Sequence, residues 1–368
     1  MKILFHLNSM GRGGAERVVS ILARAFAEKG DEVIVATQWY SENEYELGEK
    51  VRRISVGLTE ADEKCGRVKR AWIRLWRLRD CIRQERPDLV ISFCNKANFR
   101  SAFSLIGMKI PLLVSVRNDP KKDYAPYKLP TWLMEKKTAG CVFQTPEAQR
   151  FFAKKLQEKS CIIFNPLSEN YLEDSNENKI CVRKPEIVTV GRISRQKNQI
   201  LLLQAFANVQ KKYPDYVIKI YGDIQDEAVH EELQKYIKKE GLEAKVLFMG
   251  ISDSTKEEIR DAALFVLPSD YEGMPNALIE AMAMGIPSIS TDCPCGGSAM
   301  LMEHKVSGML VPVGDGEAME QALCYMLDNK ERAERMGEEA KKILEKVHPQ
   351  VVCRQWEEYI GKIMQNKR

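Results

Sequence analysis

Two cations stand just behind a strand-like segment in the middle of the chain. Residues 188–190 (Val-Thr-Val) are typical of a short buried strand. Gly191 follows them, and Arg192 and Lys197 precede a helical pattern at residues 200–211. Where a strand gives way to a helix, free backbone N–H groups and the positive end of the helix dipole point in one direction. With two full charges added, this corner suits a diphosphate. An ordinary surface turn with solvated cations explains the same residues equally well.

Two carboxylates, Glu272 and Glu280, lie eight residues apart in the second half of the chain. The first falls in a loop after a predicted strand, and the second falls in the helix that Asn276 opens; Gly273 and Pro275 shape the loop. Carboxylates accept hydrogen bonds from hydroxyls, so a pocket with both of them suits a ribose and a sugar. Taken singly, each is better explained as a capping, surface or loop charge. Together, behind the diphosphate corner, they favour a polyol site.

A glycine-rich turn, Gly11-Arg-Gly13-Gly14, lies between a predicted strand at residues 2–7 and a helix at residues 15–29. A second strand follows at residues 32–37, and this order is typical of a parallel doubly wound sheet. The turn lacks the GxGxxG pattern of dinucleotide-binding proteins. Its glycines would let a ligand approach the backbone closely. For a single Gly-Gly pair, a structural tight turn is the better explanation.

The same alternation of strands and helices continues along the chain and then restarts. The remaining strands of the first half are predicted at residues 88–93, 111–116, 141–144 and 161–164. A polar stretch at residues 168–184 is interpreted as a linker. Strands are then predicted at residues 186–190, 217–221, 246–249, 264–268 and 287–291, with helices at residues 200–211, 226–241, 256–263, 276–284, 317–327 and 350–364. Two such domains in succession predict a cleft between them.

Residues 64–86 form a strongly basic segment with helical periodicity. Its charged residues are Lys64, Arg67, Lys69, Arg70, Arg74, Arg77, Arg79, Arg83 and Arg86 against Asp80 and Glu85. Its apolar stripe is Val68, Ala71, Trp72, Leu75, Leu78 and Ile82. Ile73 and Trp76 fall outside this stripe, among the cations. Contact with an anionic membrane surface is favoured over a core helix with a solvated basic face. A nucleic-acid-binding stripe is the weakest reading, because no recognised module accompanies it.

Composition restricts the class of protein. The chain has 368 residues, 44% of them apolar and 29% charged, with a formal net charge of +4. These values predict a globular protein of two domains, and nothing in them requires nucleic acid. No apolar run is long enough to span a bilayer, and the N-terminus reads as a strand rather than a signal peptide. The ten cysteines are scattered and most sit in apolar runs, as is typical of reduced thiols in a cytosol. The CxC spacing of Cys293 and Cys295 and the presence of only four His argue against a zinc site.

Three motifs carry a resemblance to a known family. They are Gly13-Gly14-Ala-Glu-Arg, Gly191-Arg192 with Lys197-Asn198, and the segment Glu-Gly-Met-Pro-Asn-Ala-Leu-Ile-Glu from Glu272 to Glu280. Together they resemble the retaining glycosyltransferases of family 4, over nearly the whole chain. The resemblance implies an α/β protein of the GT-B fold, with two Rossmann-like doubly wound domains facing across a cleft. We expect an acceptor domain at residues 1–168, a nucleotide-sugar domain at 169–347, and a final helix at 348–368 that returns to the first domain.

The same resemblance implies a role for each matching residue. Arg192 and Lys197 would hold the donor diphosphate, and Glu272 would bind hydroxyls of the donor sugar. Glu280 would bind the ribose, and the base would lie against the backbone at Ile251. The other donor-site positions are Gly13, Gly14, Asn198, Gly273, Met274, Pro275, Asn276, Ala277 and Leu278.

This chain departs from the family pattern after the strand at residues 111–116. Many members carry a His there, facing the sugar, whereas this chain has Arg117-Asn118. Asn118 could still offer a hydrogen bond, so it joins Arg192, Lys197 and Glu272 as a predicted catalytic residue. The implied reaction needs no metal or other cofactor, because two fixed cations and a helix dipole stabilise the leaving diphosphate.

Two further segments, Thr291-Asp-Cys-Pro-Cys-Gly-Gly297 and Val116-Arg-Asn-Asp-Pro120, resemble a bacterial subgroup that acts on polyprenyl-diphosphate-linked glycans. That likeness implies a UDP-sugar donor (a hexose or N-acetylhexosamine, with GalNAc preferred) and a lipid-linked glycan acceptor. Together with the reduced cysteines and the basic segment at residues 64–86, it predicts a cytoplasmic protein that is peripheral on the inner face of the cell membrane. Nucleic acid is not an expected partner. The alternatives are a GT-B transferase or epimerase with a soluble acceptor, and a non-catalytic nucleotide-sugar-binding scaffold.

Overall fold

The computed structural model describes residues 1–172, 182–252 and 254–365. The chain divides into two units: unit 1 comprises residues 1–166 with 349–368, and unit 2 comprises residues 167–348. The domain boundaries expected from the sequence lie within two residues of these. Of the predicted linker at residues 168–184, the part from 173 to 181 lies outside the described residues.

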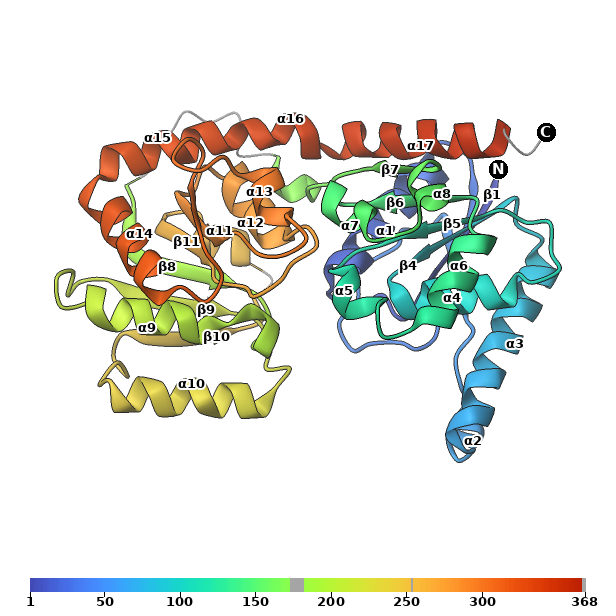
Figure 1. Ribbon diagram of the computed structural model, residues 1–368, viewed down its shortest axis with the longest axis horizontal. Helices are drawn as coiled ribbons and strands as arrows, with labels where there is room; N and C mark the ends of the chain where they lie inside the picture. The colour runs from blue at the N-terminus through green and yellow to red at the C-terminus, as the bar shows by residue number, and fades with distance from the viewer. Residues whose placement is uncertain (173–181, 253, 366–368) are drawn as a thin grey trace. The chain divides into compact units, whose positions relative to one another are not determined.

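Unit 1 is built on a seven-stranded sheet in which all neighbouring strands run parallel, in the order β3-β2-β1-β4-β5-β6-β7 (Figure 1). Its strands are β1 (Lys2–Leu7), β2 (Glu32–Thr37), β3 (Val51–Ser55), β4 (Leu89–Phe93), β5 (Leu112–Ser115), β6 (Gly140–Phe143) and β7 (Ser160–Ile162). The predicted doubly wound parallel sheet is confirmed. β3 was not predicted, because Arg52 and Arg53 interrupt its apolar pattern; their side chains form ion pairs with Glu85 and Glu44 instead.

Helices cover both faces of this sheet. They are α1 (Gly14–Glu28), α2 (Glu60–Glu63), α3 (Arg67–Glu85), α4 (Asn95–Ser104), α5 (Pro120–Asp123), α6 (Lys128–Lys137), α7 (Pro146–Arg150), α8 (Lys154–Gln157) and α17 (Pro349–Gln365). Alternate strand residues point to opposite faces. Phe5 packs on Phe26 of α1, with ring centroids 6.1 Å apart. The next residue, His6, bonds Ser101 of α4 at 2.8 Å from its Nδ1.

The last helix, α17, packs within unit 1. Trp356 is fully buried and stacks on Phe93, with ring centroids 5.6 Å apart. The Tyr359 hydroxyl donates to the Lys159 carbonyl at 2.5 Å and accepts from the Cys141 N–H at 2.9 Å. Gly140 allows this approach, because a Cβ there would lie 2.4 Å from Cδ1 of Ile363. The helix is thereby fixed to the β6 and β7 side of the sheet.

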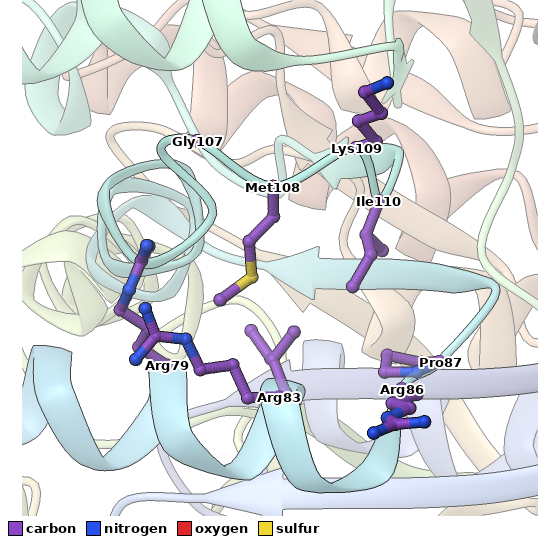
Figure 2. Close-up of a pocket in the computed structure, with 9 residues that line it drawn as sticks. Arg79, Arg83, Arg86, Pro87, Gly107, Met108, Lys109 and Ile110 are labelled. Carbon is purple, nitrogen blue, oxygen red and sulfur yellow. The ribbon is translucent and has the colours of Figure 1, made fainter.

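The apolar stripe predicted for residues 64–86 is only partly buried. Leu78 and Ile82 are buried, and Leu75 is half-buried. Val68, Ala71 and Trp72 are exposed instead of packed, because the N-terminal half of α3 extends beyond the sheet with α2 (Figure 1). The C-terminal half runs beside the loop at residues 107–110 (Figure 2). Periodicity identified a shared face correctly but overestimated how much of it the core covers.

Unit 2 contains a six-stranded sheet, also parallel throughout, in the order β10-β9-β8-β11-β12-β13. Its strands are β8 (Lys184–Val190), β9 (Val217–Tyr221), β10 (Val246–Gly250), β11 (Ala262–Leu267), β12 (Ser288–Thr291) and β13 (Met309–Val311). The strand order reverses between β8 and β11. In an open α/β sheet, the carboxyl ends of the two strands at such a reversal flank the ligand-binding crevice. The three-residue β13 is too short to stand out in the sequence.

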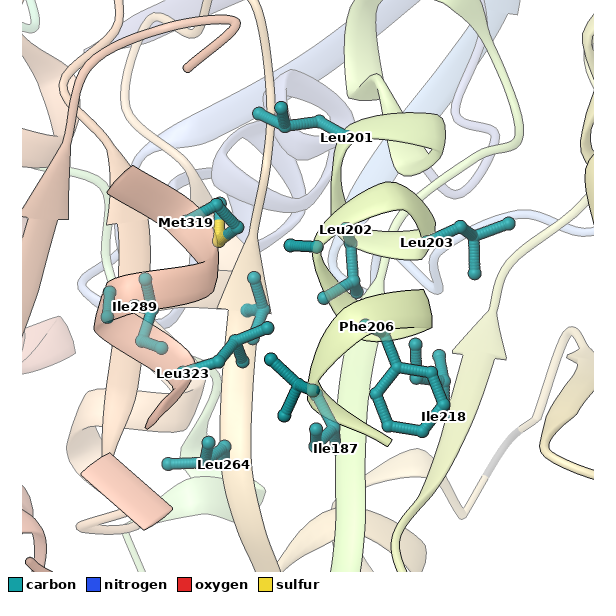
Figure 3. Close-up of a cluster of buried hydrophobic side chains, with 14 of the residues drawn as sticks. Ile187, Leu201, Leu202, Leu203, Phe206, Ile218, Leu264, Ile289, Met319 and Leu323 are labelled. Atoms are coloured by element: carbon teal, nitrogen blue, oxygen red, sulfur yellow. The ribbon is translucent and has the colours of Figure 1, made fainter. Parts of the chain in front are cut away.

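The helices of unit 2 are α9 (Gln199–Val209), α10 (Glu227–Lys239), α11 (Thr255–Ile259), α12 (Asn276–Ala283), α13 (Gly297–Leu301), α14 (Gly316–Asp328), α15 (Lys330–Ala340) and α16 (Leu344–Val347). α11 is shorter than the helix predicted at residues 256–263, because Ala262 and Ala263 already belong to β11. Figure 3 shows the core between α9, α14 and the strands, where Phe206 and Leu323 face Ile187 and Leu264. This core supports the amino-terminal end of α9, which directly follows Asn198.

Candidate functional site

The loops that follow β8 and β11 are neighbours at the carboxyl edge of the sheet in unit 2. The two strands pair in parallel, with Ile187 opposite Leu264 and Val188 opposite Phe265. After β8 the chain passes Gly191 and Arg192 and forms a 3₁₀ turn at Arg195–Lys197 before α9 begins. Most of the predicted donor-site residues therefore lie around the point where the strand order reverses.

Three hydrogen bonds fasten the two loops to each other. The Asp270 N–H donates to the Gln196 carbonyl at 2.9 Å, and the Gln196 side chain donates to the Tyr271 carbonyl at 2.9 Å. Asn198 adds a bond from its Nδ2 to Oδ1 of Asp270 at 2.6 Å. Asn198 was expected to touch the donor; the structure uses its side chain to position the loop. Both loops are held in place before any ligand arrives.

Lys197 and Glu272 form an ion pair, with Nζ and Oε1 2.6 Å apart. Ser269 donates to the same Oε1 at 2.7 Å. The pair is sheltered, because the two side chains are only 16% and 9% exposed. The sequence had given these residues separate roles, one toward a diphosphate and one toward a sugar. Gly191 leaves room for the lysine stem, since a Cβ at that position would lie 2.9 Å from Cε of Lys197.

Arg192 differs from Lys197 in its surroundings. Its side chain is exposed and forms no ion pair with any residue in the described part of the chain. Its backbone is fixed, because the carbonyl of Arg192 accepts a hydrogen bond from the Gln199 side chain at 3.0 Å. Arg192 therefore presents a positive charge that the protein leaves uncompensated, on a backbone that is held in position.

Glu280 is buried inside unit 2, with 4% of its surface exposed. It lies on α12, and its Oε2 accepts a hydrogen bond from the Tyr171 hydroxyl at 3.3 Å. Tyr171 comes from a 3₁₀ turn (Glu169–Tyr171) in the segment interpreted as a linker, and sequence reasoning missed it. No pattern around Tyr171 signals this contact. Burial argues against the simple surface or capping role that Glu280 would have by itself.

The start of α12 is enclosed by a second loop. Gly273, Met274, Pro275 and Leu278 are buried, and Asn276 and Ala277 are half-buried. A Cβ at Gly297 would lie 1.9 Å from the Gly273 carbonyl oxygen, so the loop after β12 packs directly on the loop before α12. Only glycine permits this approach, which gives Gly297 a structural reason. Ile251, by contrast, is 55% exposed after β10.

The thiol of Cys293 lies near Glu272, and burial together with that carboxylate raises its pKa to about 12. Cys293 is therefore protonated at neutral pH and is a poor nucleophile. Among the residues that the structure describes, no group of three or more His, Cys, Asp or Glu side chains is placed to hold a metal ion.

The remaining predicted residues belong to unit 1. Gly13 caps α1 and its N–H donates to the Gly11 carbonyl at 2.7 Å, so that donor is already used within the turn. Gly14 is the first residue of α1. Arg117 turns inward: it donates to Oδ1 of Asn165 at 2.7 Å and stacks over Phe93 at 4.7 Å.

Burial lowers the pKa of Arg117 to about 10. Asn118 is half-buried and forms no hydrogen bond within the described ranges. Of the two residues that stand where the family pattern has a His, Asn118 is therefore the one with a side chain available to a ligand.

Comparison with known families now adds to this geometry. A model described as Glycosyltransferase Family 4 matches residues 12–167, and one described as Glycosyl transferases group 1 matches residues 171–343. The two matches adjoin and together cover most of the chain. The chain belongs to the family 4 glycosyltransferases. The predicted enzyme class is thus confirmed, and residues 12–167 and 171–343 correspond closely to the two units of the structure.

Two relatives of this glycosyltransferase come from Campylobacter jejuni serotype O:2. One, 24% identical over 99% of each chain, is named GalNAc-alpha-(1->4)-GalNAc-alpha-(1->3)-diNAcBac-PP-undecaprenol alpha-1,4-N-acetyl-D-galactosaminyltransferase. The other, 24% identical over 89% of this chain and 90% of the relative, is named N-acetylgalactosamine-N,N'-diacetylbacillosaminyl-diphospho-undecaprenol 4-alpha-N-acetylgalactosaminyltransferase.

Solved structures agree on the fold. The crystal structure of Anabaena HepE with UDP-glucose superposes with a TM-score of 0.80 at 18% identity, covering 98% of this chain and all of the other. The GT-B fold, with two Rossmann-like domains, is confirmed. In the described part of this glycosyltransferase, no helix is both long and apolar enough to cross a bilayer.

Proposed function

We propose that this family 4 enzyme transfers a hexose or N-acetylhexosamine, in the first place GalNAc, from a UDP-sugar to a polyprenyl-diphosphate-linked glycan. The observation that carries the proposal is the cluster of Arg192, Lys197 and Glu272 at the strand-order reversal of unit 2. The acceptor class is supported by the two Campylobacter relatives, which match along most of the chain.

The Lys197–Glu272 pair suits the shape of a nucleotide sugar. In such a donor, the anomeric carbon is bonded directly to an oxygen of the diphosphate. A cation for the diphosphate and a carboxylate for the sugar hydroxyls should therefore be neighbours, and these two groups are 2.6 Å apart. The arriving diphosphate would draw Lys197 toward itself, and a sugar hydroxyl would replace the lysine on Glu272.

Arg192 would supply the second positive charge to the diphosphate. The N–H groups at Asn276, Ala277 and Leu278 would add the positive end of the α12 dipole, which has no acidic residue in its first turn. Two cations and a helix end offer the charge stabilisation that a metal ion supplies in other transferases. We therefore propose that the reaction is independent of metal. Buried Glu280, with Tyr171 behind it, would bind the ribose hydroxyls.

The proposed reaction retains the anomeric configuration. The bond from the anomeric carbon to the phosphate oxygen breaks, and UDP leaves with the bonding electrons. The acceptor hydroxyl attacks the same face of the sugar, and its proton passes to the departing phosphate oxygen. Asn118 would position the sugar, so Asn118→Ala should lower kcat more than it changes the donor KM. An unchanged kcat would remove Asn118 from the site.

Nucleotide release tests this function directly. The protein is incubated with a panel of nucleotide sugars, each with and without a polyprenyl-diphosphate-linked glycan, and released UDP is measured. Release that requires the lipid-linked glycan supports the proposal, and release with a soluble glycan alone contradicts the acceptor. Conversion of the donor to its epimer would indicate an epimerase. If no combination of donor and acceptor releases UDP, the protein is a non-catalytic scaffold that binds nucleotide sugars. Repeating the active pair in excess chelator tests metal independence, and lost activity would contradict it.

A lipid-linked acceptor requires the enzyme to reach a membrane, and we propose that α3 makes this contact on the cytoplasmic face. Val68, Trp72 and Trp76 are 73%, 58% and 50% exposed on the half of α3 that extends beyond the sheet. Exposed Trp beside Arg and Lys is typical of helices that lie at an anionic bilayer surface. A solvated helix has no need to expose three large apolar side chains.

The membrane contact is tested by sedimentation with vesicles that contain an anionic phospholipid. Replacing Trp72 and Trp76 with Ser should abolish sedimentation of the protein. Trp39→Ser is the control, because Trp39 is also exposed in unit 1 but lies outside α3. Equal sedimentation of the α3 variant and the control would contradict the proposal.

A further inference from the structure

A pocket of about 440 Å³ lies between the C-terminal end of α3 and the loop at residues 107–110 (Figure 2). The residues that line it precede β4 and β5, so it opens at the amino edge of the sheet in unit 1. Asn118 and the turn at Gly13 follow their strands, at the carboxyl edge. Within unit 1, the pocket is therefore separate from the residues given a role in sugar transfer.

The charge around this pocket is positive. Arg79, Arg83, Arg86 and Lys109 line it, and no acidic residue is among the described residues that do so. Two of the acids nearest in sequence are engaged elsewhere. Glu85 binds Lys2 and Arg52, and Asp88 accepts from the Lys2 backbone at 2.8 Å.

The four cations differ in how far the protein compensates them. Arg79 donates to the carbonyls of Ser104 and Ile106. Arg83 has only a loose pair with Asp80, at 3.7 Å between exposed side chains. Arg86 and Lys109 form no ion pair with any described residue. The α3 dipole favours a cation at the helix end, but it does not require three arginines on one face of the last turns. An anionic ligand would compensate this surplus.

The pocket also has an apolar side. Figure 2 shows Met108 and Ile110 projecting from the loop toward α3, on which Arg79, Arg83 and Arg86 lie, whereas the Lys109 side chain points away from the helix. Ile82 on α3 adds to this apolar lining. Cations around an apolar floor suit a phosphate group that is attached to an apolar body, rather than a fully hydrated inorganic anion.

One face of α3 connects the pocket to the exposed tryptophans. Val68, Trp72, Trp76, Arg79, Arg83 and Arg86 follow one another at spacings of four, four, three, four and three residues. Residues three and four apart share a face of a helix. The apolar half of this stripe is the surface proposed to lie at the bilayer, and its cationic half lines the pocket. A lipid at that bilayer surface would therefore meet the pocket with its headgroup.

We propose that this pocket binds the phosphate-bearing headgroup of an anionic membrane lipid, beside the tryptophans that enter the interface. The proposal rests on the membrane contact proposed above for α3. The proposal assigns the lipid-charge preference of the enzyme to Arg83 and Arg86, and the tryptophans supply contact with any bilayer surface.

The test compares the full-length Arg83→Gln/Arg86→Asn variant with an Arg24→Gln/Arg150→Gln control. Asn suits position 86, whose φ is +48°, and both control arginines are exposed in unit 1 without a described ion pair. Both variants lose two positive charges. We expect the pocket variant to bind anionic phosphatidylglycerol vesicles roughly tenfold to thirtyfold more weakly than the control. Binding to purely zwitterionic vesicles should be the same for both. Equal binding of the two variants to anionic vesicles would overturn the proposal.

Two further measurements distinguish a failure of the pocket proposal from a failure of the α3 membrane contact or of the proposed transferase activity. If Trp72→Ser/Trp76→Ser sediments like the parent, the α3 contact fails, and the pocket assignment fails with it. Nucleotide release with detergent-dispersed acceptor should stay at the parent level in the pocket variant, because the pocket takes no part in transfer. A separate binding experiment uses inorganic pyrophosphate to distinguish a lipid headgroup from free phosphate. If pyrophosphate binds the parent without vesicles and the pocket variant fails to bind it, the site takes free phosphate, and the lipid assignment is wrong.

Discussion

The two sheets reverse their strand order in the same way, yet they fill that position with opposite chemistry. In unit 1 the ends of β1 and β4 carry His6 and Ser92, both fully buried and bonded to α4. In unit 2 the ends of β8 and β11 lead to an exposed Arg192 and a sheltered Lys197–Glu272 pair. In unit 1 the polar groups at the strand-order reversal are hydrogen-bonded within the protein, whereas in unit 2 charged groups remain there for a ligand. The fold supplies the location, and the loop residues decide whether it becomes a site.

Arg192→Ala should give the largest effect on activity and thereby isolate the role of unit 2. Its side chain is exposed and unpaired within the described residues, so its loss should leave the melting temperature unchanged. The kcat should fall roughly 10²–10³-fold if the arginine stabilises the leaving diphosphate.

The matched change in unit 1 is Arg100→Met. Arg100 donates to Asn8 at 2.9 Å, so we expect lower stability with kcat near the parent value. The comparison fails if Arg192→Ala lowers stability instead of kcat, or if the two variants lose activity alike.

Lys197→Ala should affect both activity and stability, which distinguishes Lys197 from Arg192. It removes the partner of a carboxylate that is only 9% exposed. Leaving such a charge unpaired costs about 3 kcal/mol, at the low end for buried pairs because the site opens to solvent. Adding Glu272→Gln to Lys197→Ala should restore most of the free energy of unfolding but none of the kcat. A double variant no more stable than Lys197→Ala would show that the ion pair does not stabilise the loops after β8 and β11.

His6 provides the corresponding test of unit 1. Burial, with Arg100 nearby, lowers the pKa of His6 to about 3. The unfolded chain gains a proton near pH 6.5 and the folded protein does not, so stability falls as the pH drops from 6.5 toward 3. Between about pH 7.5 and pH 5.5 the loss should be about 1.4 kcal/mol.

The His6→Gln variant should lack this part of the pH dependence, as measured by urea unfolding at the two pH values. Its other neighbours, Ser101 and Gln38, do not titrate in this range. An identical pH dependence in the parent and the variant would contradict a buried, neutral His6.

Most of the candidate site in unit 2 could be predicted from the sequence, because its residues follow strand ends and open helices. Arg192, Lys197, Glu272 and Glu280 were found in this way. The ion pair between Lys197 and Glu272 could not be predicted, because it depends on β8 and β11 being neighbours despite a separation of 75 residues. Ser269, three residues before Glu272, was the one accessible signal for the support of that carboxylate.

The fold was predictable where apolar strands are long, and less so elsewhere. β3 and β13 were missed, one for its arginines and the other for its length. The exposed half of α3 was misjudged because periodicity shows which residues share a face and not how far the protein body extends beneath it. Tyr171 lies in a stretch whose composition resembles a linker, and only the folded chain brings it to Glu280.

Tyr171→Phe should give the smallest effect and tests whether Glu280 is a ligand-binding group held in position. The change removes a hydroxyl that donates to Oε2 of Glu280 at 3.3 Å and keeps the ring. A hydrogen bond to a carboxylate contributes about 1–2 kcal/mol, so the donor KM should rise roughly fivefold to thirtyfold with kcat little changed. Tyr325→Phe is a control, because Tyr325 contacts Arg332 at an exposed position in the same unit. A fall in kcat at constant KM would mean that Tyr171 acts on the reacting sugar rather than through a ribose-binding Glu280.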